Sequence, residues 1–345
     1  MKKKNIVFLC ILLLTGFVWS QKITIKVASI APSRSPWDIE QKALAAEWAE
    51  ITDGLVEVKF YNTTPMGGEG GVIKKMKSVF PGQKPPIDGA IFTNIGIYEL
   101  APKSNALTLC VPFMFRSQDE LTYVLDELEP EIVSAVESNG YRLLGWFNVG
   151  WGNFFTKEIA RTPDEIKDLK MGFSGISSPG LMTAFKTAGF NMIDLPTDKI
   201  LQSIKSSNGI SVIFSVPMYA YATQYYTGLS YIVKNPLTPI MTGIVISNEA
   251  WNSIPDKYKP ELEASIERAE KKFISVQQET DAAYIEKIVN EGLELVTLTD
   301  SEVLTWEKEL RADAIEMGQD KDSVINLEFF NKVTDLLDEY RAAND

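Results

Sequence analysis

Few residues of this chain have the types and spacing that catalysis requires. The sequence contains no histidine, so the commonest general base and metal ligand is missing. Ser174 stands in Gly172-Phe173-Ser174-Gly175, which lacks the Gly-x-Ser-x-Gly spacing of a nucleophile elbow. The stretch Gly67 to Gly71 lacks the Gly-Lys-Ser/Thr ending of a phosphate-binding loop, and a tight turn into a helix is the better interpretation. The sequence therefore predicts no enzymatic activity, no metal site and no cofactor.

The first residues have the pattern of a secretory signal. Lys2 to Lys4 precede the apolar run Ile6 to Leu14, and Val18 and Ser20 suit a signal peptidase, so we expect cleavage after Ser20 and a periplasmic protein. Only Cys110 follows that signal, so a disulfide within the mature chain is excluded. The formal net charge of −12 argues against nucleic acid and anionic membrane surfaces as partners.

Short strand-like segments alternate with longer helix-like ones along the chain, which is typical of an α/β fold. Strands are predicted over Ile23–Ser29, Val56–Tyr61, Ile87–Phe92, Arg142–Phe147, Asp168–Phe173 and Ile210–Phe214. Helices are predicted over Trp37–Thr52, Val72–Val79, Gln118–Ser138, Pro179–Ala188, Asp198–Ser206 and Leu327–Ala343, with two long stretches between Asp256 and Glu291. The aromatic segment that begins at Asn148 is expected to be a loop.

Several segments, in order along the chain, match one protein family. They are APSRSPW from Ala31, VEVKFYNTTPMGG from Val56, CVPFMFRSQDEL from Cys110, LGWFNVGWGNFFT from Leu144, TPDEIKDLKMGF from Thr162 and ISNEAWNSIPDKYKPELEASIERA from Ile246. Singly these motifs are weak, but their order and spacing carry the resemblance. From about Ile25 to Thr299 the chain resembles the extracytoplasmic solute-binding subunits of TRAP transporters, the DctP-like family.

The resemblance implies a two-lobed α/β clamp that closes on a ligand, with a long helix crossing both lobes. Carried onto this sequence, residues 1–20 are the signal peptide, 21–147 plus 238–272 form lobe I, 148–237 plus 273–325 form lobe II, and 326–345 form a C-terminal helix. The implied partners are a small-molecule ligand and the membrane subunits of the transporter. A tetratricopeptide-repeat protein outside the membrane is a further partner that some such binding proteins have.

The chain departs from the family at the residues that hold an organic acid. The family's LKxR motif ends in an arginine whose planar fork pairs with a carboxylate, and here that position is Gly172. A second family arginine aligns with Gly152. We expect that packing alone does not account for the loss of both charges, and that the ligand is apolar or amphipathic.

The predicted ligand-binding residues are aromatic and apolar side chains with a few polar groups among them. Apolar burial would supply most of the binding energy, at about 25 cal/mol per Å². The predicted set is Ser29, Trp37, Phe92, Thr93, Asn94, Ile95, Trp151, Gly152, Asn153, Phe154, Gly172, Phe173, Ser174, Phe214, Ser215 and Tyr219.

Three other interpretations stay open at this point. The protein could bind an organic acid through non-standard residues such as Arg34 or Lys170. It could be a sensor or scaffold that presents the closed clamp to a signalling partner. An enzyme on the same fold, such as a lysine-dependent hydrolase, would need a paired nucleophile and base, which the sequence does not reveal.

Overall fold

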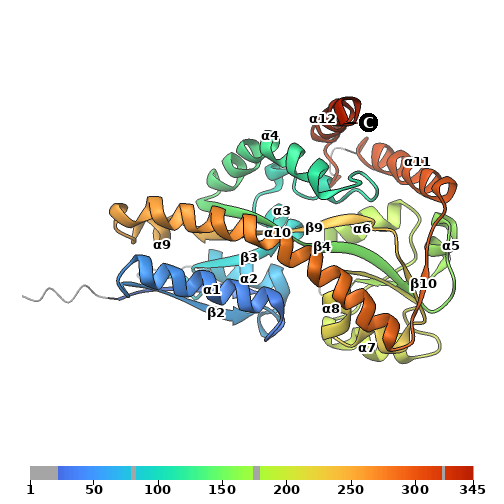
Figure 1. Ribbon diagram of the computed structural model, residues 1–345, viewed down its shortest axis with the longest axis horizontal. Helices are drawn as coiled ribbons and strands as arrows, with labels where there is room; N and C mark the ends of the chain where they lie inside the picture. Colours follow the sequence, from blue (N-terminus) through green and yellow to red (C-terminus); the bar gives the residue numbers. More distant parts are fainter. Residues whose placement is uncertain (1–21, 79–82, 174–178, 321–322, 345) are drawn as a thin grey trace, which may run out of the picture.

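A computed structural model describes residues 22–78, 83–173, 179–320 and 323–344 of the chain (Figure 1). The predicted signal peptide and Ser174 lie outside these residues. The described part is a two-lobed α/β protein, as the sequence predicts, with two strands and one long helix running from one lobe into the other.

Lobe I contains the first sheet, whose strands lie in the order β2-β1-β3-β9-β4. The strands β1 (Ile23–Ser29), β2 (Val56–Asn62) and β3 (Gly89–Thr93) are parallel to one another. The strand β9 (Thr238–Ser247) is antiparallel to β3 and also pairs with β4 (Tyr141–Thr156). Since the parallel strands end together, Ser29 and Thr93 lie at the same edge of the sheet, where ligands of open α/β sheets bind.

Helices cover both faces of the lobe I sheet. One face packs against α1, α9 and the first half of α10, and the other packs against α2, α3, α4 and α12. Their bounds are α1 (Pro36–Ile51), α2 (Gly68–Lys77), α3 (Asn94–Leu100), α4 (Gln118–Glu137), α9 (Asn248–Asn252), α10 (Lys259–Asn290) and α12 (Leu327–Asn344). The sheet is therefore buried on both sides, and only its strand ends face the other lobe.

Lobe II is built on the last residues of β4, which pair with β7 (Val212–Ser215) and β8 (Tyr231–Val233). Its other strands are β5 (Met171–Phe173), β6 (Met192–Ile193) and β10 (Glu294–Val296). Its helices are α5 (Pro163–Asp168), α6 (Pro179–Thr187), α7 (Thr197–Lys205), α8 (Pro217–Ala222) and α11 (Asp300–Met317). Because β4 and β9 belong to both lobes, they form the crossing between them.

The C-terminal helix α12 is part of lobe I in the structure. Phe329, Phe330 and Val333 are buried in the same apolar cluster as α4. Arg341 donates from Nε to Glu120 Oε1 at 2.7 Å and from Nη2 to Glu120 Oε2 at 2.9 Å. Helix α11, which precedes α12, buries Trp306 in lobe II, so the C-terminal segment ties the two lobes together (Figure 1).

Most of the predicted elements are confirmed to within a few residues, two are different, and several elements, strand β9 among them, were not predicted. The segment Asn148 to Thr156, expected to be a loop, continues the strand β4. The two helical stretches between Asp256 and Glu291 are chiefly one helix of 32 residues, α10. Helix α11 was not predicted. Among the described residues, no helix combines the length and the apolar character needed to cross a membrane.

Candidate functional site

Apolar side chains from both lobes meet beside the crossing strands. We call this group the bridging cluster; its buried members are Trp37 of α1, Val149 of β4, Val216 and Met218 at the start of α8, and Phe273 of α10. Phe147 and Phe273 pack edge to face, with ring centroids 5.6 Å apart. Since α1 belongs to lobe I and α8 to lobe II, the cluster is a contact that opening of the lobes would break.

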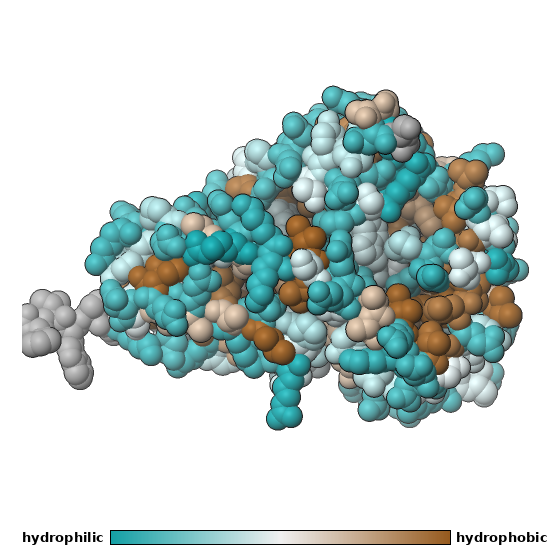
Figure 2. All heavy atoms as spheres, in the orientation of Figure 1, coloured by the Kyte–Doolittle hydropathy of each residue, from teal (hydrophilic) through white to brown (hydrophobic). Residues whose placement is uncertain are grey.

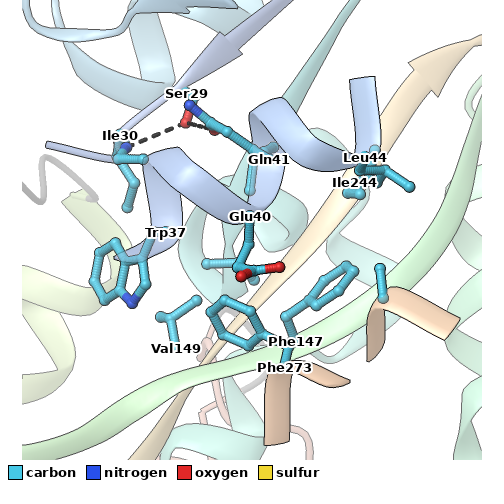
Figure 3. Close-up of a pocket in the computed structure, with 14 residues that line it drawn as sticks. Ser29, Ile30, Trp37, Glu40, Gln41, Leu44, Phe147, Val149, Ile244 and Phe273 are labelled. Carbon is cyan, nitrogen blue, oxygen red and sulfur yellow. Dashed lines mark hydrogen bonds between the residues drawn. The ribbon is translucent and has the colours of Figure 1, made fainter. Parts of the chain in front are cut away.

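A pocket borders the bridging cluster, and we call it the α1–α10 pocket (Figure 3). It encloses about 550 Å³ of empty space, with the solvent at its mouth included. Its lining residues come from the ends of β1 and β3, from α1 and α10, and from both crossing strands: Ser29, Ile30, Ala31, Trp37, Glu40, Gln41, Leu44, Ile91, Phe147, Val149, Thr242, Ile244, Ala269 and Phe273.

The polar groups at one wall of the pocket bond mainly to one another. Ser29 Oγ donates to Gln41 Oε1 at 2.7 Å, as Figure 3 shows, and Gln41 Nε2 donates to Asp38 Oδ1 at 3.0 Å. Glu40, the one charged residue of the lining, accepts a hydrogen bond from Lys272 Nζ at 2.6 Å. The lining therefore contains no lysine or arginine that could pair with a carboxylate in the pocket.

The indole of Trp37 is the exception to this internal pairing. Its side chain is buried, and Nε1 has no hydrogen-bond partner among the described residues. In Figure 3 the nitrogen lies on the edge of the ring nearer to Val149. A buried donor without an acceptor costs free energy, so this N–H is a group to which a ligand could bond.

Glycine occupies both positions of the missing arginines because apolar side chains fill the adjacent space. A Cβ atom at Gly152 would lie 2.1 Å from Phe214 Cζ, and one at Gly172 would lie 2.3 Å from Ile210 Cδ1. Real Cβ atoms do not approach other atoms so closely. No side chain fits at either position without movement of Phe214 or Ile210, so packing is one constraint on the two glycines.

Some of the sequence-predicted residues come together at the site. Ser29 and Trp37 line the α1–α10 pocket. Tyr219 packs against the bridging cluster from α8, and the buried Ser215 lies directly before Val216 of that cluster. These four residues support the predicted location between the lobes.

Other predicted residues lie elsewhere, because they stand on sheet faces that helices cover or, like Ile95, on helix α3. Phe92 and Ile95 are buried in the core of lobe I, and Trp151 packs partly against it. Phe154 packs between Phe214 and Trp306 in lobe II, with both ring centroids 5.8 Å away. These aromatic side chains form core contacts and do not line the α1–α10 pocket.

The two predicted asparagine donors are also occupied within the protein. Asn94 Nδ2 donates to Ala106 O at 3.0 Å, and its Oδ1 accepts the backbone N–H of Met241 at 2.8 Å. Asn153 Nδ2 donates to Val233 O at 2.9 Å. These amides hold backbone segments together, in contrast to the predicted role in orienting a ligand. Phe173 is described through its strand β5 alone.

Glu69, in the first turn of α2, has a buried carboxylate that contacts the backbone at the start of α3, and the sequence did not predict it. It accepts the backbone N–H of Thr93 at 2.6 Å and the hydroxyl of Thr93 at 2.8 Å, and the N–H of Gly96 also bonds to it. Burial raises its pKa to about 7, and its charge helps to raise the pKa of Tyr219, which burial chiefly raises. The one hint in the sequence was that Glu69 is an acidic residue flanked by four glycines. Thr93, a predicted donor, is thus paired with Glu69.

Two further carboxylates of α10 hold the crossing strand β4 where it is irregular. The register of β4 against β9 shifts between Leu143 and Trp146 and again between Asn148 and Trp151. Glu270 Oε1 accepts the N–H of Trp146 at 2.6 Å, and Asp281 Oδ2 accepts the N–H of Trp151 at 3.0 Å. Burial raises the pKa of Glu270 to about 7 and that of Asp281 to about 6. In a helix rich in exposed acids, nothing in the sequence distinguishes these two.

The described residues contain no group of three or more histidine, cysteine or acidic side chains placed to hold a metal ion. What the site offers is an apolar pocket beside a contact between two lobes. Such a site can enclose a ligand by hinge closure.

Comparisons with known proteins agree with this geometry. Residues 27–320 match the family model described as "Bacterial extracellular solute-binding protein, family 7" (DctP). A solute-binding protein of Chromohalobacter salexigens is 23% identical over 274 residues, which cover 79% of this chain and 78% of the relative.

Two solved structures share the fold. A TRAP periplasmic solute-binding protein from Chromohalobacter salexigens, solved with bound D-glucuronate, has a TM-score of 0.77 at 20% identity and covers 91% of this chain and 99% of its own. Another from Sulfurospirillum deleyianum, solved with bound succinate, has a TM-score of 0.74 at 20% identity, with coverage of 93% and 99%. The family match spans most of the chain and confirms the resemblance in the sequence. The chain belongs to the DctP family of bacterial extracellular solute-binding proteins, whose members are the binding subunits of transporters and not enzymes.

Proposed function

We propose that this protein captures a small apolar or amphipathic molecule between its lobes and delivers it to the membrane subunits of a TRAP-type transporter. The observation that carries the proposal is the lining of the α1–α10 pocket, in which Glu40 is the one charged side chain. A ligand there gains binding energy from apolar burial, at about 0.8 kcal/mol per buried CH₂.

The two glycines that align with the family's arginines bear on the organic-acid alternative, although they lie outside the pocket lining. An arginine at position 152 would need the space that the ring of Phe214 occupies, and one at position 172 would need the space of Ile210. At both positions the family's carboxylate-binding arginine is replaced by a glycine that borders an apolar side chain.

An organic acid is the second candidate, because the solved relatives have bound D-glucuronate and succinate. The cations that the sequence offers for such a ligand are poorly placed. Lys170 is exposed, and its Nζ donates to Asn208 O at 2.9 Å in lobe II. Arg34 is exposed in the loop before α1 and is absent from the pocket lining.

Export to the periplasm is part of the proposal and rests on the family and on the predicted signal in the first twenty residues. The tetratricopeptide-repeat partner stays a prediction from the sequence resemblance.

A thermal-shift screen separates the two candidate ligand classes. Ligand-free protein is melted with succinate, with D-glucuronate and with medium-chain alcohols and monoacylglycerols. A ligand at a hundred times its Kd stabilises the native state by about 2.7 kcal/mol, so binding is visible as a higher Tm. We expect the apolar compounds to raise the Tm and the carboxylates to leave it unchanged. The reverse pattern would establish the organic-acid candidate.

A further inference from the structure

We propose that the ligand is an amphipath with an uncharged head, whose hydrogen-bond acceptor meets Trp37 Nε1 while its apolar tail fills the α1–α10 pocket. This inference rests on the proposed function and specifies the ligand's chemistry at that site.

The head-group assignment comes from the indole of Trp37. Other tryptophans of the chain show the usual outcome for a buried indole, since Trp48 Nε1 donates to Ser265 Oγ at 3.1 Å and Trp306 Nε1 donates to Arg161 O at 2.8 Å. Trp146 and Trp251, like Trp37, have no acceptor among the described residues, but neither of them lines the pocket. Trp37 thus combines an unpaired buried N–H with a place in the pocket wall.

The tail assignment comes from the other walls. Leu44 of α1 and Ile244 of β9 line the pocket together with Phe147 and Phe273 (Figure 3), and Ile91 of β3 also belongs to the lining. None of these side chains can hydrogen-bond to a ligand. The polar pair Ser29 and Gln41 is already bonded internally, so the pocket offers the tail an apolar surface and offers the head the unpaired donor of Trp37.

An uncharged head follows from the charges at the site. No lysine or arginine lines the pocket, and the carboxylate of Glu40 lies among the lining residues, although Lys272 pairs with it. An anionic head would be desolvated without a cation and placed near another carboxylate, which is costly. An alcohol, ester or amide oxygen accepts the indole N–H without that cost.

The same donor couples capture to closure. Trp37 belongs to the same buried cluster as Val216 and Met218 of lobe II, so we expect closing of the lobes to bury its N–H. With no acceptor in place the closed state loses a hydrogen bond to water, and with an acceptor the bond is restored. A ligand with both parts therefore favours the closed clamp over the open one.

The test is isothermal titration of ligand-free protein with primary alcohols from hexan-1-ol to decan-1-ol, and with octanoate as the anionic match of octan-1-ol. We expect affinity to rise about fourfold for each added CH₂ until the pocket is full, and octanoate to bind at least tenfold more weakly than octan-1-ol.

Variants then locate the head and the tail. Trp37→Phe keeps an aromatic ring but removes the N–H, and should weaken octan-1-ol about tenfold. Ala269→Leu narrows the pocket from α10 and should weaken the longer alcohols about tenfold. Ala264→Leu, on the same helix and half-buried but outside the lining, and Trp251→Phe, in the core of lobe I, are the matched controls and should bind as the wild type does. Melting curves without ligand confirm that each variant is folded.

Each outcome decides between the two proposals. Wild-type affinity for alcohols in both Trp37→Phe and Ala269→Leu would overturn the assignment of this pocket while leaving the apolar ligand class intact. Equal or tighter binding of octanoate would overturn the uncharged head. A wild-type protein that binds succinate or D-glucuronate tightly and no alcohol would overturn the proposed function as well. The alcohol series is measured on the wild-type protein. If affinity does not rise with chain length, the tail assignment is overturned, even if the substitutions unfold the protein.

Discussion

At the scale of single residues, two glycines at the predicted ligand site pack directly against apolar side chains. Gly152 and Gly172 are accommodated by Phe214 and Ile210, whose side chains come within 2.1 and 2.3 Å of the place a Cβ would take. The sequence resemblance implies that two family arginines are replaced by glycine, but it does not indicate which side chains fill the adjacent space. Phe214 and Ile210 are far along the chain from Gly152 and Gly172 respectively, and strand pairing brings them together, β7 against β4 and β5 against β7.

The fit at Gly152 predicts a cost for the smallest possible addition. We expect Gly152→Ala to lower the free energy of unfolding by about 1–3 kcal/mol, because an added methyl group in a packed region forces neighbours out of place. Urea denaturation measures the change. Gly70→Ala is the control: no atom lies within 4 Å of its added Cβ, and it sits inside helix α2, where alanine is favoured over glycine by about 1 kcal/mol. Equal effects of the two substitutions would refute the packing explanation.

At the scale of elements, helix α10 and strand β4 depend on each other. The strand loses regular pairing with β9 at two places, and α10 supplies a carboxylate to a backbone N–H at each, Glu270 at Trp146 and Asp281 at Trp151. The helix itself was predicted from its pattern. The continuation of β4 was not, because the bulges interrupt the period of two that marks a strand.

The raised pKa of Asp281 predicts that stability falls as the pH rises. The native protein keeps this proton up to about pH 6, whereas the unfolded chain releases it near pH 3.8. Between these values the native state binds more protons, so the slope of unfolding free energy against pH is negative. The contribution is complete below about pH 3.8 and is lost as the pH passes 6. The raised pKa values of Glu69 and Glu270 also make stability fall as the pH rises, between the usual glutamate pKa of 4.5 and about 7.

Asp281→Asn isolates one of these groups. An asparagine oxygen can still accept the N–H of Trp151 but does not titrate, so we expect the loss of stability between pH 4 and pH 8 to shrink by about 2 kcal/mol. Urea titrations across this pH range provide the measurement. Glu267→Gln, an exposed position on the same helix, should leave the pH dependence as it is. An unchanged slope in Asp281→Asn would show that Asp281 is not the source.

At the scale of the whole molecule, three connections join the two lobes: the strands β4 and β9, the helix α10, and the C-terminal segment of α11 and α12 (Figure 1). Figure 2 shows scattered apolar patches on the face that α1 and α10 share, among a largely hydrophilic surface. Clamp architecture was predictable from the order of family motifs. The place of α12 was not, because its contacts with α4 join segments about 200 residues apart, for example Lys332 with Glu131.

Helix α12 is attached to α4 by an ion pair whose carboxylate is buried, so removal of its partner should be costly. Glu120 has 4% of its surface exposed and is paired with Arg341. Arg341→Met would leave this carboxylate unpaired, and we expect a loss of about 3 kcal/mol in unfolding free energy. Adding Glu120→Gln should restore part of it. Lys332→Met, which removes an exposed pair with Glu131, should change stability by less than about 1 kcal/mol. Similar losses from the two single substitutions would contradict the special role of the Arg341 pair.

The central claim is that this clamp binds an apolar or amphipathic solute and no longer binds a carboxylate through paired arginines. Native mass spectrometry of the protein purified from its own cells tests it most directly, with extraction and identification of whatever molecule comes with it. We predict an adduct that partitions into organic solvent and whose head group is uncharged. A bound hydrophilic carboxylate, such as a dicarboxylate or a uronate, would contradict the account.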